Sequence, residues 1–312
     1  MVISQNIELA KKNLDSGKLI GLPTETVYGL AGNALDPDVI LNIYEIKKRP
    51  FFNPLIAHIG EKGQINNLCI NIPDAAHVLI DEFWPGPLTL ILEKSEIVPH
   101  LLTSGSNKIA VRLPSHPMAI KLLQSLKYPL AAPSANPFQY VSPTSAQHVI
   151  DQLGKSISFV LDGGPCSIGI ESTIIGFNNN EVEVYRLGGI PVKAIEKILK
   201  TKTKPMFMDK KLTYPGQGKK HYSPKKKIFC ISHGESFKAE KSKSIFISWK
   251  PDSKSFDSIS LDGSTRSGAS RLFSILRRLD ATEFEEIYIE RAPNRGLGPA
   301  INDRLTRASH PS

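Results

Sequence analysis

The sequence contains little cysteine and no long apolar run. Its three cysteines, Cys69, Cys166 and Cys230, lie far apart and form no C-x-x-C motif. An odd number of widely spaced cysteines excludes a disulfide framework and argues against a structural zinc site, and it is typical of a reducing compartment. No apolar run reaches the roughly 18 residues of a membrane span, and residues 1–7 lack the charged and apolar parts of a secretory leader. We therefore expect a cytoplasmic protein with no membrane segment.

The common cofactor motifs are also missing. No G-x-G-x-x-G follows an expected strand, and no H-E-x-x-H occurs among the eight histidines. Residues 154–156, Gly-Lys-Ser, are similar to the end of a P-loop, but Val149 stands where that motif needs glycine and a strand follows instead of a helix. The sequence therefore indicates no NAD, flavin or zinc, and no classical phosphate loop.

The net charge of +9 is confined to one segment. Residues 200–227 contain ten lysines and one acidic residue, Asp209, whereas the rest of the chain carries 29 basic and 29 acidic residues. A broad RNA-binding face needs basic residues spread over a domain, so this distribution argues against one. The segment is either a solvated linker or a local contact for a polyanion, such as a weak contact with RNA.

The length of 312 residues favours two domains. Apolar spacing predicts helices over residues 3–14, 36–49, 74–84, 116–126, 145–153 and 191–199. It predicts strands over residues 19–22, 55–59, 88–92, 109–113, 130–132, 157–161, 173–177 and 182–186. Several strands follow one another without room for a crossover helix. The expected fold class is therefore α/β, with a twisted mixed sheet in a domain of residues 1–200.

A change of composition separates this domain from the C-terminal part of the chain. Residues 201–227 are rich in lysine, proline and glycine and are expected to form a linker or lid. The remaining residues, 228–312, predict a smaller Rossmann-like α/β domain. Its strands are expected over 228–231, 245–249 and 287–290, and its helices over 268–279 and 299–308.

The stretch from Leu22 to Leu55 concentrates polar groups around two expected loops. Residues 23–30 follow an expected strand and read P-T-E-T-V-Y-G-L. Residues 47–50, Lys-Lys-Arg-Pro, stand at the end of an expected helix. Loops at strand ends often carry the chemistry of α/β proteins. Lys47 and Arg49 either complement the negative end of the helix dipole or bind a polyphosphate or carboxylate. The rigid exit at Pro50 favours the second interpretation.

A second polar turn follows the expected strand 130–132. Ser134 and Asn136 alternate with Pro133 and Pro137, which hold both polar side chains on a rigid turn. Ser134 lacks the G-x-S-x-G context of a hydrolase nucleophile. We therefore interpret both side chains as hydrogen-bonding groups for an anion.

Three further polar residues each have two interpretations. Ser142 begins Ser-Pro-Thr-Ser before a helix, where it is either a plain cap or part of an anion site. His58 alternates with apolar neighbours and is either a core histidine or a pocket residue. Arg186 ends a strand before a glycine turn, and it either serves that turn or contacts phosphate.

Taken in order, these motifs resemble the YrdC-like family, in particular its two-domain L-threonylcarbamoyl-AMP synthases. The family patterns P-T-E-T-x-Y-G-L, K-x-R-P and S-x-N occur at 23–30, 47–50 and 134–136, followed by S-P-T, E-S-T-I and R-x-G at 142–144, 171–174 and 186–188. The linker is similar to the long family form through P-G-x4-H-Y-x-P at 215–224, and residues 298–308 resemble its closing helix. Residues 214 and 218–220 and Lys108 depart from the pattern.

The resemblance implies a nucleotidyltransferase reaction of L-threonine, bicarbonate and ATP, aided by Mg²⁺ bridged by phosphates rather than held by protein side chains. The product, threonylcarbamoyl-AMP, supplies a downstream transferase that modifies tRNA adenosine beside the anticodon. The implied catalytic residues are Lys47, Arg49, Ser134 and Asn136. The implied ATP-binding residues are Arg49, Asn53, Lys108, Ser134, Ser142, Arg186 and His221. The implied threonine-binding residues are Thr26, His58, Arg112, Ala132 and Ser172.

The rival hypothesis from another class is a non-catalytic module that binds double-stranded RNA or tRNA. The balanced charge outside residues 200–227 argues against it. If the synthase interpretation holds, the lysine-rich segment has a second use. By folding over the site with His221 on the nucleotide, it would shield a carbamate and a mixed anhydride from water.

Overall fold

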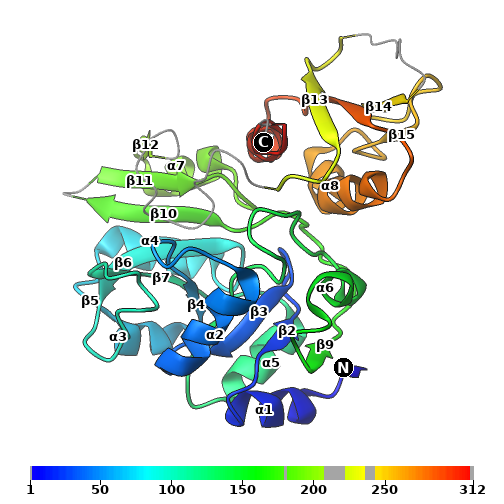
Figure 1. Cartoon of the computed structure of the whole chain (residues 1–312). Helices are drawn as coiled ribbons and strands as arrows, with labels where there is room; N and C mark the ends of the chain where they lie inside the picture. Colours follow the sequence, from blue (N-terminus) through cyan, green and yellow to red (C-terminus); the bar gives the residue numbers. More distant parts are fainter. Residues whose placement is uncertain (1, 179–180, 207–221, 236–242, 310–312) are drawn as a thin grey trace.

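The computed structural model describes residues 2–178, 181–206, 222–235 and 243–309. These residues form a mixed sheet of twelve strands followed by a parallel sheet of four strands (Figure 1). The predicted α/β class, the mixed first sheet and the smaller second α/β unit are confirmed. None of the described helices is long and apolar enough to cross a membrane.

The larger sheet has the strand order β1-β9-β2-β3-β8-β4-β7-β6-β10-β11-β12, with β5 paired to β6. Its strands are β1 (Val2–Ser4), β2 (Ile20–Leu22), β3 (Gly29–Asn33), β4 (Ile56–His58), β5 (Cys69–Ile70), β6 (Leu88–Lys94), β7 (Lys108–Arg112), β8 (Leu130–Ala131), β9 (Phe159–Leu161), β10 (Thr173–Asn178), β11 (Glu181–Arg186) and β12 (Thr203–Pro205). The helices of this domain are α1 (Ile7–Asp15), α2 (Pro37–Lys47), η1 (Lys62–Gln64), α3 (Ile65–Leu68), α4 (Asp74–Phe83), α5 (Pro117–Ser125), α6 (Ala146–Leu153) and α7 (Val192–Leu199).

Helix α2 shows how the local sequence sets an element next to the site. The Asp36 side chain accepts hydrogen bonds from the first turn, and Pro37 occupies the start of the helix, where no intrahelical N–H bond is lost. Lys48 adopts a left-handed conformation with φ 51° and ends the helix. This stop places Lys47 on the last turn and Arg49 just beyond it.

The two faces of the larger sheet carry different cores. Helices α1 and α5 pack with β2 and β9 around Leu14, Ile20 and Leu122. A larger cluster including Ile43, Leu90 and further residues of α2, α4 and α6 fills the opposite side. A third, small cluster of Ile56, Ala110, Ile174 and three further residues covers the face of β4, β7 and β10 opposite the larger cluster. It ends at the site described below, whose lining includes Ile56.

Several elements differ from the sequence-based expectation. Residues 2–4 form strand β1, paired with β9, instead of the first turn of a helix. Residues 29–33 form strand β3, where the sequence predicted a loop up to Leu30 and no strand after it, because glycines hide its strand pattern. One of them, Gly32, is required by packing, since a Cβ there would lie 2.4 Å from Leu19 and 2.5 Å from Val39. Strand β12 pairs with β11 inside the predicted linker, so the first sheet extends to residue 205.

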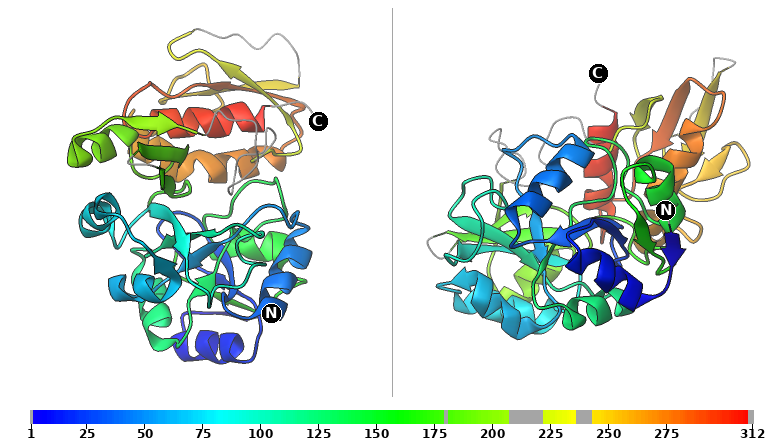
Figure 2. Two further views of the ribbon diagram at one scale, coloured as in Figure 1. Left: turned by 90° about the vertical axis from the view of Figure 1, so that its left-hand side faces the viewer. Right: turned by 60° about the horizontal axis from the view of Figure 1, so that its bottom comes forward.

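The second sheet has the order β13-β16-β14-β15, all parallel. Its elements are β13 (Lys227–Ile231), β14 (Ser244–Ser248), β15 (Asp257–Ser258), α8 (Thr265–Asp280), β16 (Glu286–Glu290) and α9 (Gly298–Ala308). Both helices lie between this sheet and the first domain (Figure 2). Their core also takes in Val27, Val141 and Ile170 of the first domain. The C-terminal domain therefore packs directly beside the loops that carry the predicted site.

Candidate functional site

One pocket gathers residues from several strand ends of the larger sheet. It lies where β4 and β7 end, and their last residues, His58 and Arg112, are register partners. Ser172 precedes β10 and Arg186 ends β11, so both reach the same edge. The pocket is lined by Thr26, Val27, Arg49, Pro54, Leu55, Ile56, His58, Arg112, Ala132, Pro133, Ser134, Glu171, Ser172, Arg186 and Tyr222.

The structure brings together most of the site residues predicted from the sequence. Those that line the pocket are Thr26, Arg49, His58, Arg112, Ala132, Ser134, Ser172 and Arg186. Those that lie behind its wall are Lys47, Asn53, Ser142 and Asn136. Lys108 lies elsewhere, and His221 falls outside the described residues.

Arg49 presents a fixed guanidinium to the pocket. Its Nε donates to the Asn53 carbonyl oxygen at 2.9 Å, and its Nη2 donates to Asn53 Oδ1 at 2.6 Å and to the Pro54 carbonyl oxygen at 2.9 Å. Burial lowers the pKa of Arg49 to about 10, so the group stays charged at neutral pH. Asn53 therefore acts on the site by orienting Arg49.

Arg186 is the second cation of this wall. Its Nε donates to the Ser172 carbonyl oxygen at 3.0 Å and its Nη2 donates to the Ser172 hydroxyl at 2.9 Å. Burial lowers its pKa to about 10, which again leaves it charged at neutral pH. Among the described residues, no carboxylate forms an ion pair with Arg49 or Arg186. A buried and a half-buried guanidinium group, neither paired with a carboxylate of the described residues, favour an anionic ligand.

Arg112 differs because it already has an acidic partner. Its Nη2 lies 2.7 Å from Glu25 Oε1, and its Nη1 donates to Thr26 Oγ1 at 2.8 Å. The Thr24 hydroxyl donates to the Val27 carbonyl oxygen, so Thr26 donates its own proton to Thr24 Oγ1 at 2.8 Å. The hydroxyl proton of Thr26 is therefore already used in a hydrogen bond. The remaining lone pair of Thr26 Oγ1 can accept a hydrogen bond from a ligand.

His58 forms a neutral part of the wall. Its Nδ1 lies 3.2 Å from the Ile56 carbonyl oxygen, and only 2% of the residue is exposed. Burial, and then the charge of Arg112, lower the pKa of His58 to about 3. An imidazole in this state is uncharged at neutral pH, so it can shape a pocket and hydrogen-bond but adds no cation.

The position of Lys47 corrects the expectation that its ammonium group faces phosphate. The Nζ atom turns away from the pocket and donates to the carbonyl oxygens of Ser134 at 2.5 Å and Asn136 at 2.6 Å. The side chain is buried, and this burial holds its pKa well below the usual range. Lys47 therefore fastens helix α2 to the turn that presents Ser134.

Asn136 and Ser142 also point inward rather than into the pocket. Asn136 Nδ2 donates to the carbonyl oxygens of Pro137 at 2.9 Å and Tyr140 at 2.8 Å. Ser142 Oγ donates to Glu171 Oε1 at 2.6 Å. In this structure both side chains stabilise the loop 134–142, and neither lies at the pocket surface.

Lys108 is not part of the pocket, contrary to its predicted place beside ATP. Lys108 is the first residue of β7 and Arg112 is the last, so the two residues lie at opposite ends of this strand. Its Nζ donates to the Phe177 carbonyl oxygen at 3.2 Å, and it lines a different hollow with Asn71 and Glu93. The family resemblance implied a place beside ATP for this position, but β7 carries Lys108 away from the pocket.

Sequence reasoning gave no role to several residues of the pocket region, three of which are charged. Glu25 and Glu171 stood in recognised motifs without a role, and Arg304 of α9 pairs with Glu171. The apolar stripe of α9, with Ile301 and Leu305, contains Arg304 at helical spacing. An arginine on such a stripe signals a buried acidic partner, which was the available clue.

Tyr222 closes one side of the pocket. It is 1% exposed, stacks on Phe273 of α8 with ring centroids 5.4 Å apart, and lies beneath the Arg304 guanidinium. The free space between the walls is about 50 Å³. Sites for small molecules usually occupy roughly 300–1,000 Å³. A ligand of nucleotide size therefore needs the pocket walls to move apart.

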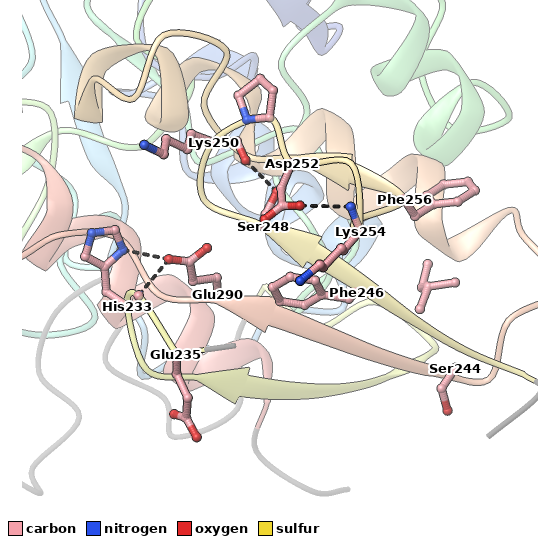
Figure 3. A pocket seen from close by; sticks show the side chains of 13 residues that line it. His233, Glu235, Ser244, Phe246, Ser248, Lys250, Asp252, Lys254, Phe256 and Glu290 are labelled. Atoms are coloured by element: carbon pink, nitrogen blue, oxygen red, sulfur yellow. Dashed lines mark hydrogen bonds and ion pairs between the residues drawn. The ribbon is translucent and has the colours of Figure 1, made fainter. Parts of the chain in front are cut away.

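A larger hollow of about 1080 Å³ lies in the C-terminal domain (Figure 3). His233 and Glu290 face each other there, with Nδ1 and Oε1 2.9 Å apart. Glu290 also accepts hydrogen bonds from the backbone N–H groups of Gly234 and Trp249. None of the predicted site residues that the structure describes lines this hollow. Within the described residues, no group of three or more His, Cys, Asp or Glu side chains is arranged to hold a metal ion.

Comparison with known proteins covers both domains. A family profile for Sua5, YciO and YrdC, described as "Telomere recombination", matches residues 12–188. A second profile, "Threonylcarbamoyl-AMP synthase, C-terminal domain", matches residues 190–310. The chain belongs to the Sua5/YciO/YrdC family. The resemblance predicted from the motifs is confirmed, including the two-domain form of the family.

Members of the Sua5/YciO/YrdC family are similar to this chain over nearly its whole length. The threonylcarbamoyl-AMP synthase of Pyrococcus abyssi is 37% identical over 97% of this chain and 94% of its own. That of Bacillus subtilis is 34% identical over 98% of this chain and 92% of its own. The crystal structure of P. abyssi Sua5 complexed with L-threonine is similar with a TM-score of 0.91 at 36% identity, covering 99% of this chain and 98% of the other. The two chains therefore share both domains.

Proposed function

We propose that this protein is an enzyme that makes L-threonylcarbamoyl-AMP from L-threonine, bicarbonate and ATP, with release of pyrophosphate. The observation that carries the proposal is the pocket itself. Arg112 with Thr26, a pair suited to an amino acid, lies in the same pocket as Arg49 and Arg186, two guanidinium groups that form no ion pair with a carboxylate in the described part of the chain. Full-length relatives named threonylcarbamoyl-AMP synthase support the same reaction.

The chemistry needs positioning and cations more than a nucleophilic side chain. The threonine amine and bicarbonate form a carbamate and water. A carbamate oxygen then attacks the α-phosphorus of ATP, and the bond to the β-phosphate oxygen breaks to release pyrophosphate. Arg49 and Arg186 would stabilise the charge on the phosphate oxygens. Arg112 would bind the threonine carboxylate, while Thr26, His58, Ala132 and Ser172 shape the threonine pocket.

Magnesium enters this proposal with ATP and not as a resident metal. The pocket lining contains one carboxylate, Glu171, whose two oxygens already accept from Ser142 and Arg304. Such a wall suits a Mg²⁺ ion held by phosphate oxygens and water. Chelation with EDTA is expected to stop pyrophosphate release while leaving threonine binding intact.

The product would pass to a downstream transferase that modifies tRNA, and the reaction would take place in the cytoplasm. A weak contact of the lysine-rich segment with RNA belongs to the same proposal. The decisive assay is pyrophosphate release from ATP, measured with threonine and bicarbonate together and with each omitted. Release that needs both substrates is expected. No release with the complete mixture contradicts the enzyme and favours the RNA-binding alternative, which a tRNA gel-shift assay then tests.

A further inference from the structure

The C-terminal domain reaches the pocket through one buried arginine. Arg304 of α9 is 0% exposed, and both its Nε and its Nη2 donate to Glu171 Oε2, at 3.2 and 3.0 Å. Its Nη1 donates to the Leu187 carbonyl oxygen at 2.6 Å, next to Arg186 in the chain. Glu171 belongs to the first domain and lines the pocket. The ion pair therefore joins the two domains directly behind the pocket wall.

The neighbouring helix α8 of the C-terminal domain holds the loop that carries Ser142. Arg277 of α8 donates to the Val141 carbonyl oxygen, and the Tyr140 hydroxyl donates to Asp280 of α8. Ser142 Oγ donates to the second oxygen of Glu171 at 2.6 Å. Glu171 therefore accepts hydrogen bonds from both domains: Oε1 accepts from Ser142 of the first domain, and Oε2 accepts from Arg304 of the C-terminal domain. Its carboxylate is held by groups that lie behind the pocket.

This arrangement decides what Arg186 can bind. Glu171 and Arg186 line the same pocket and their charges act on each other, yet among the described residues the hydrogen bonds of Arg186 go to Ser172 and not to Glu171. Burial opposes the ionised form of Glu171, but the charges of Arg304 and Arg186 hold its pKa below the usual value. An ionised Glu171 without Arg304 would turn to Arg186 and would repel a triphosphate.

We propose that Arg304 is a positioning residue of the nucleotide site: by holding Glu171 it keeps Arg186 available for the phosphates of ATP. The C-terminal domain then completes the site and is more than an appendage. This inference rests on the proposed function, because that function names ATP as the ligand of Arg186. It predicts that loss of Arg304 weakens ATP binding, and that the negative charge of Glu171 causes this loss of affinity.

The test compares Arg304→Met with the double variant Arg304→Met/Glu171→Gln in the full-length chain. Calorimetric titration with ATP should give a dissociation constant at least about tenfold higher for Arg304→Met, with threonine affinity unchanged. The double variant should return to within about threefold of the wild type, because its neutral amide no longer competes for Arg186. Arg291→Met is the matched control, since Arg291 also contacts α9, at Thr306, but on the exposed side of the C-terminal domain.

Two results would overturn the proposal. One is wild-type ATP affinity in Arg304→Met, and the other is a double variant that binds ATP no better than the single one. Urea unfolding identifies a variant that fails to fold. If Arg304→Met does so, Arg304→Lys replaces it, paired with Arg304→Lys/Glu171→Gln and judged by the same two comparisons. ATP binding needs no turnover, so the comparison holds even if the wild type releases no pyrophosphate, a result that would contradict only the proposed reaction.

Discussion

The ammonium group of Lys47 and the carbonyl oxygen of Ser134 lie 2.5 Å apart, although the two residues come from a helix end and a turn 87 positions apart. The Asn136 carbonyl oxygen shares the same donor at 2.6 Å. Lys47 is nearly inaccessible, so its charge is satisfied mainly by these peptide groups. This contact fixes the turn that presents Ser134 to the pocket.

Replacing Lys47 by methionine is expected to destabilise the protein as well as the site. The substitution removes the desolvation cost of a buried ammonium group, but it leaves two buried carbonyl oxygens without their donor. The second effect should win, lowering the free energy of unfolding by about 1–3 kcal/mol in urea titrations. Lys48→Met is the control, because Lys48 is exposed one residue later. Equal stability of both variants would show that the Lys47 contacts contribute nothing.

Lys47 also shows how far the sequence could lead. The K-x-R-P motif pointed to a helix end that lies beside the pocket, and the motif order predicted the family and about half of the pocket residues. The side-chain direction of Lys47 depends on the turn 134–136, which lies far away in the sequence. The same limit applies to Lys108. It stands only four residues before Arg112 in the sequence, but the two residues lie at opposite ends of β7.

Partners across the domain boundary were equally out of reach of local patterns. Arg304 and Glu171 are 133 positions apart, and their pairing follows from the packing of α9 against the first domain. Strand β3 was missed for a different reason, because glycines removed the usual strand signal while being required for close packing. Local spacing predicted the elements well, whereas non-local packing decided which polar groups face the pocket.

Arg49 and Arg112 are expected to serve different substrates. Arg49→Lys keeps a positive charge but loses the planar fork that Asn53 and Pro54 orient. Its dissociation constant for ATP should rise at least about tenfold while that for threonine stays the same. Arg112→Lys should show the reverse pattern. Titration of each variant with each substrate measures both effects, and equal loss of both substrates in both variants would contradict the division.

His58 should make stability depend on pH. Its pKa is about 3 in the folded protein and about 6.5 when unfolded, so between these values the unfolded chain binds the extra proton. Stability from this group is therefore complete above about pH 6.5 and is lost as the pH falls towards 3. At about pH 4.5 the loss amounts to about 2–3 kcal/mol.

The measurement compares urea unfolding of the wild type and His58→Asn at several pH values. The variant should lose less stability than the wild type between pH 6.5 and 4.5, whatever its stability at pH 7. His77→Asn, at an exposed position of α4, serves as the control and should follow the wild type. Parallel curves for wild type and His58→Asn would refute the assignment of this pH dependence to His58.

Gly188 should tolerate no side chain, because the pocket backbone lies against it. A Cβ there would sit 2.3 Å from the Ser172 carbonyl carbon and 2.4 Å from the Glu171 carbonyl oxygen. Both contacts are to backbone, which cannot rotate away as a side chain can. Gly188→Ala should therefore displace residues 171–172, lower the free energy of unfolding by about 2–4 kcal/mol and weaken binding of both ATP and threonine.

The matched control is Gly63→Ala, because no atom lies within 4 Å of a Cβ built at Gly63. This variant should unfold within about 0.5 kcal/mol of the wild type or be slightly more stable, since alanine restricts the unfolded chain. Full stability and substrate affinity in Gly188→Ala would mean that the segment 171–172 can shift without cost. In that case the close approach of Gly188 would not determine the position of Ser172, the residue that accepts the hydrogen bonds of Arg186.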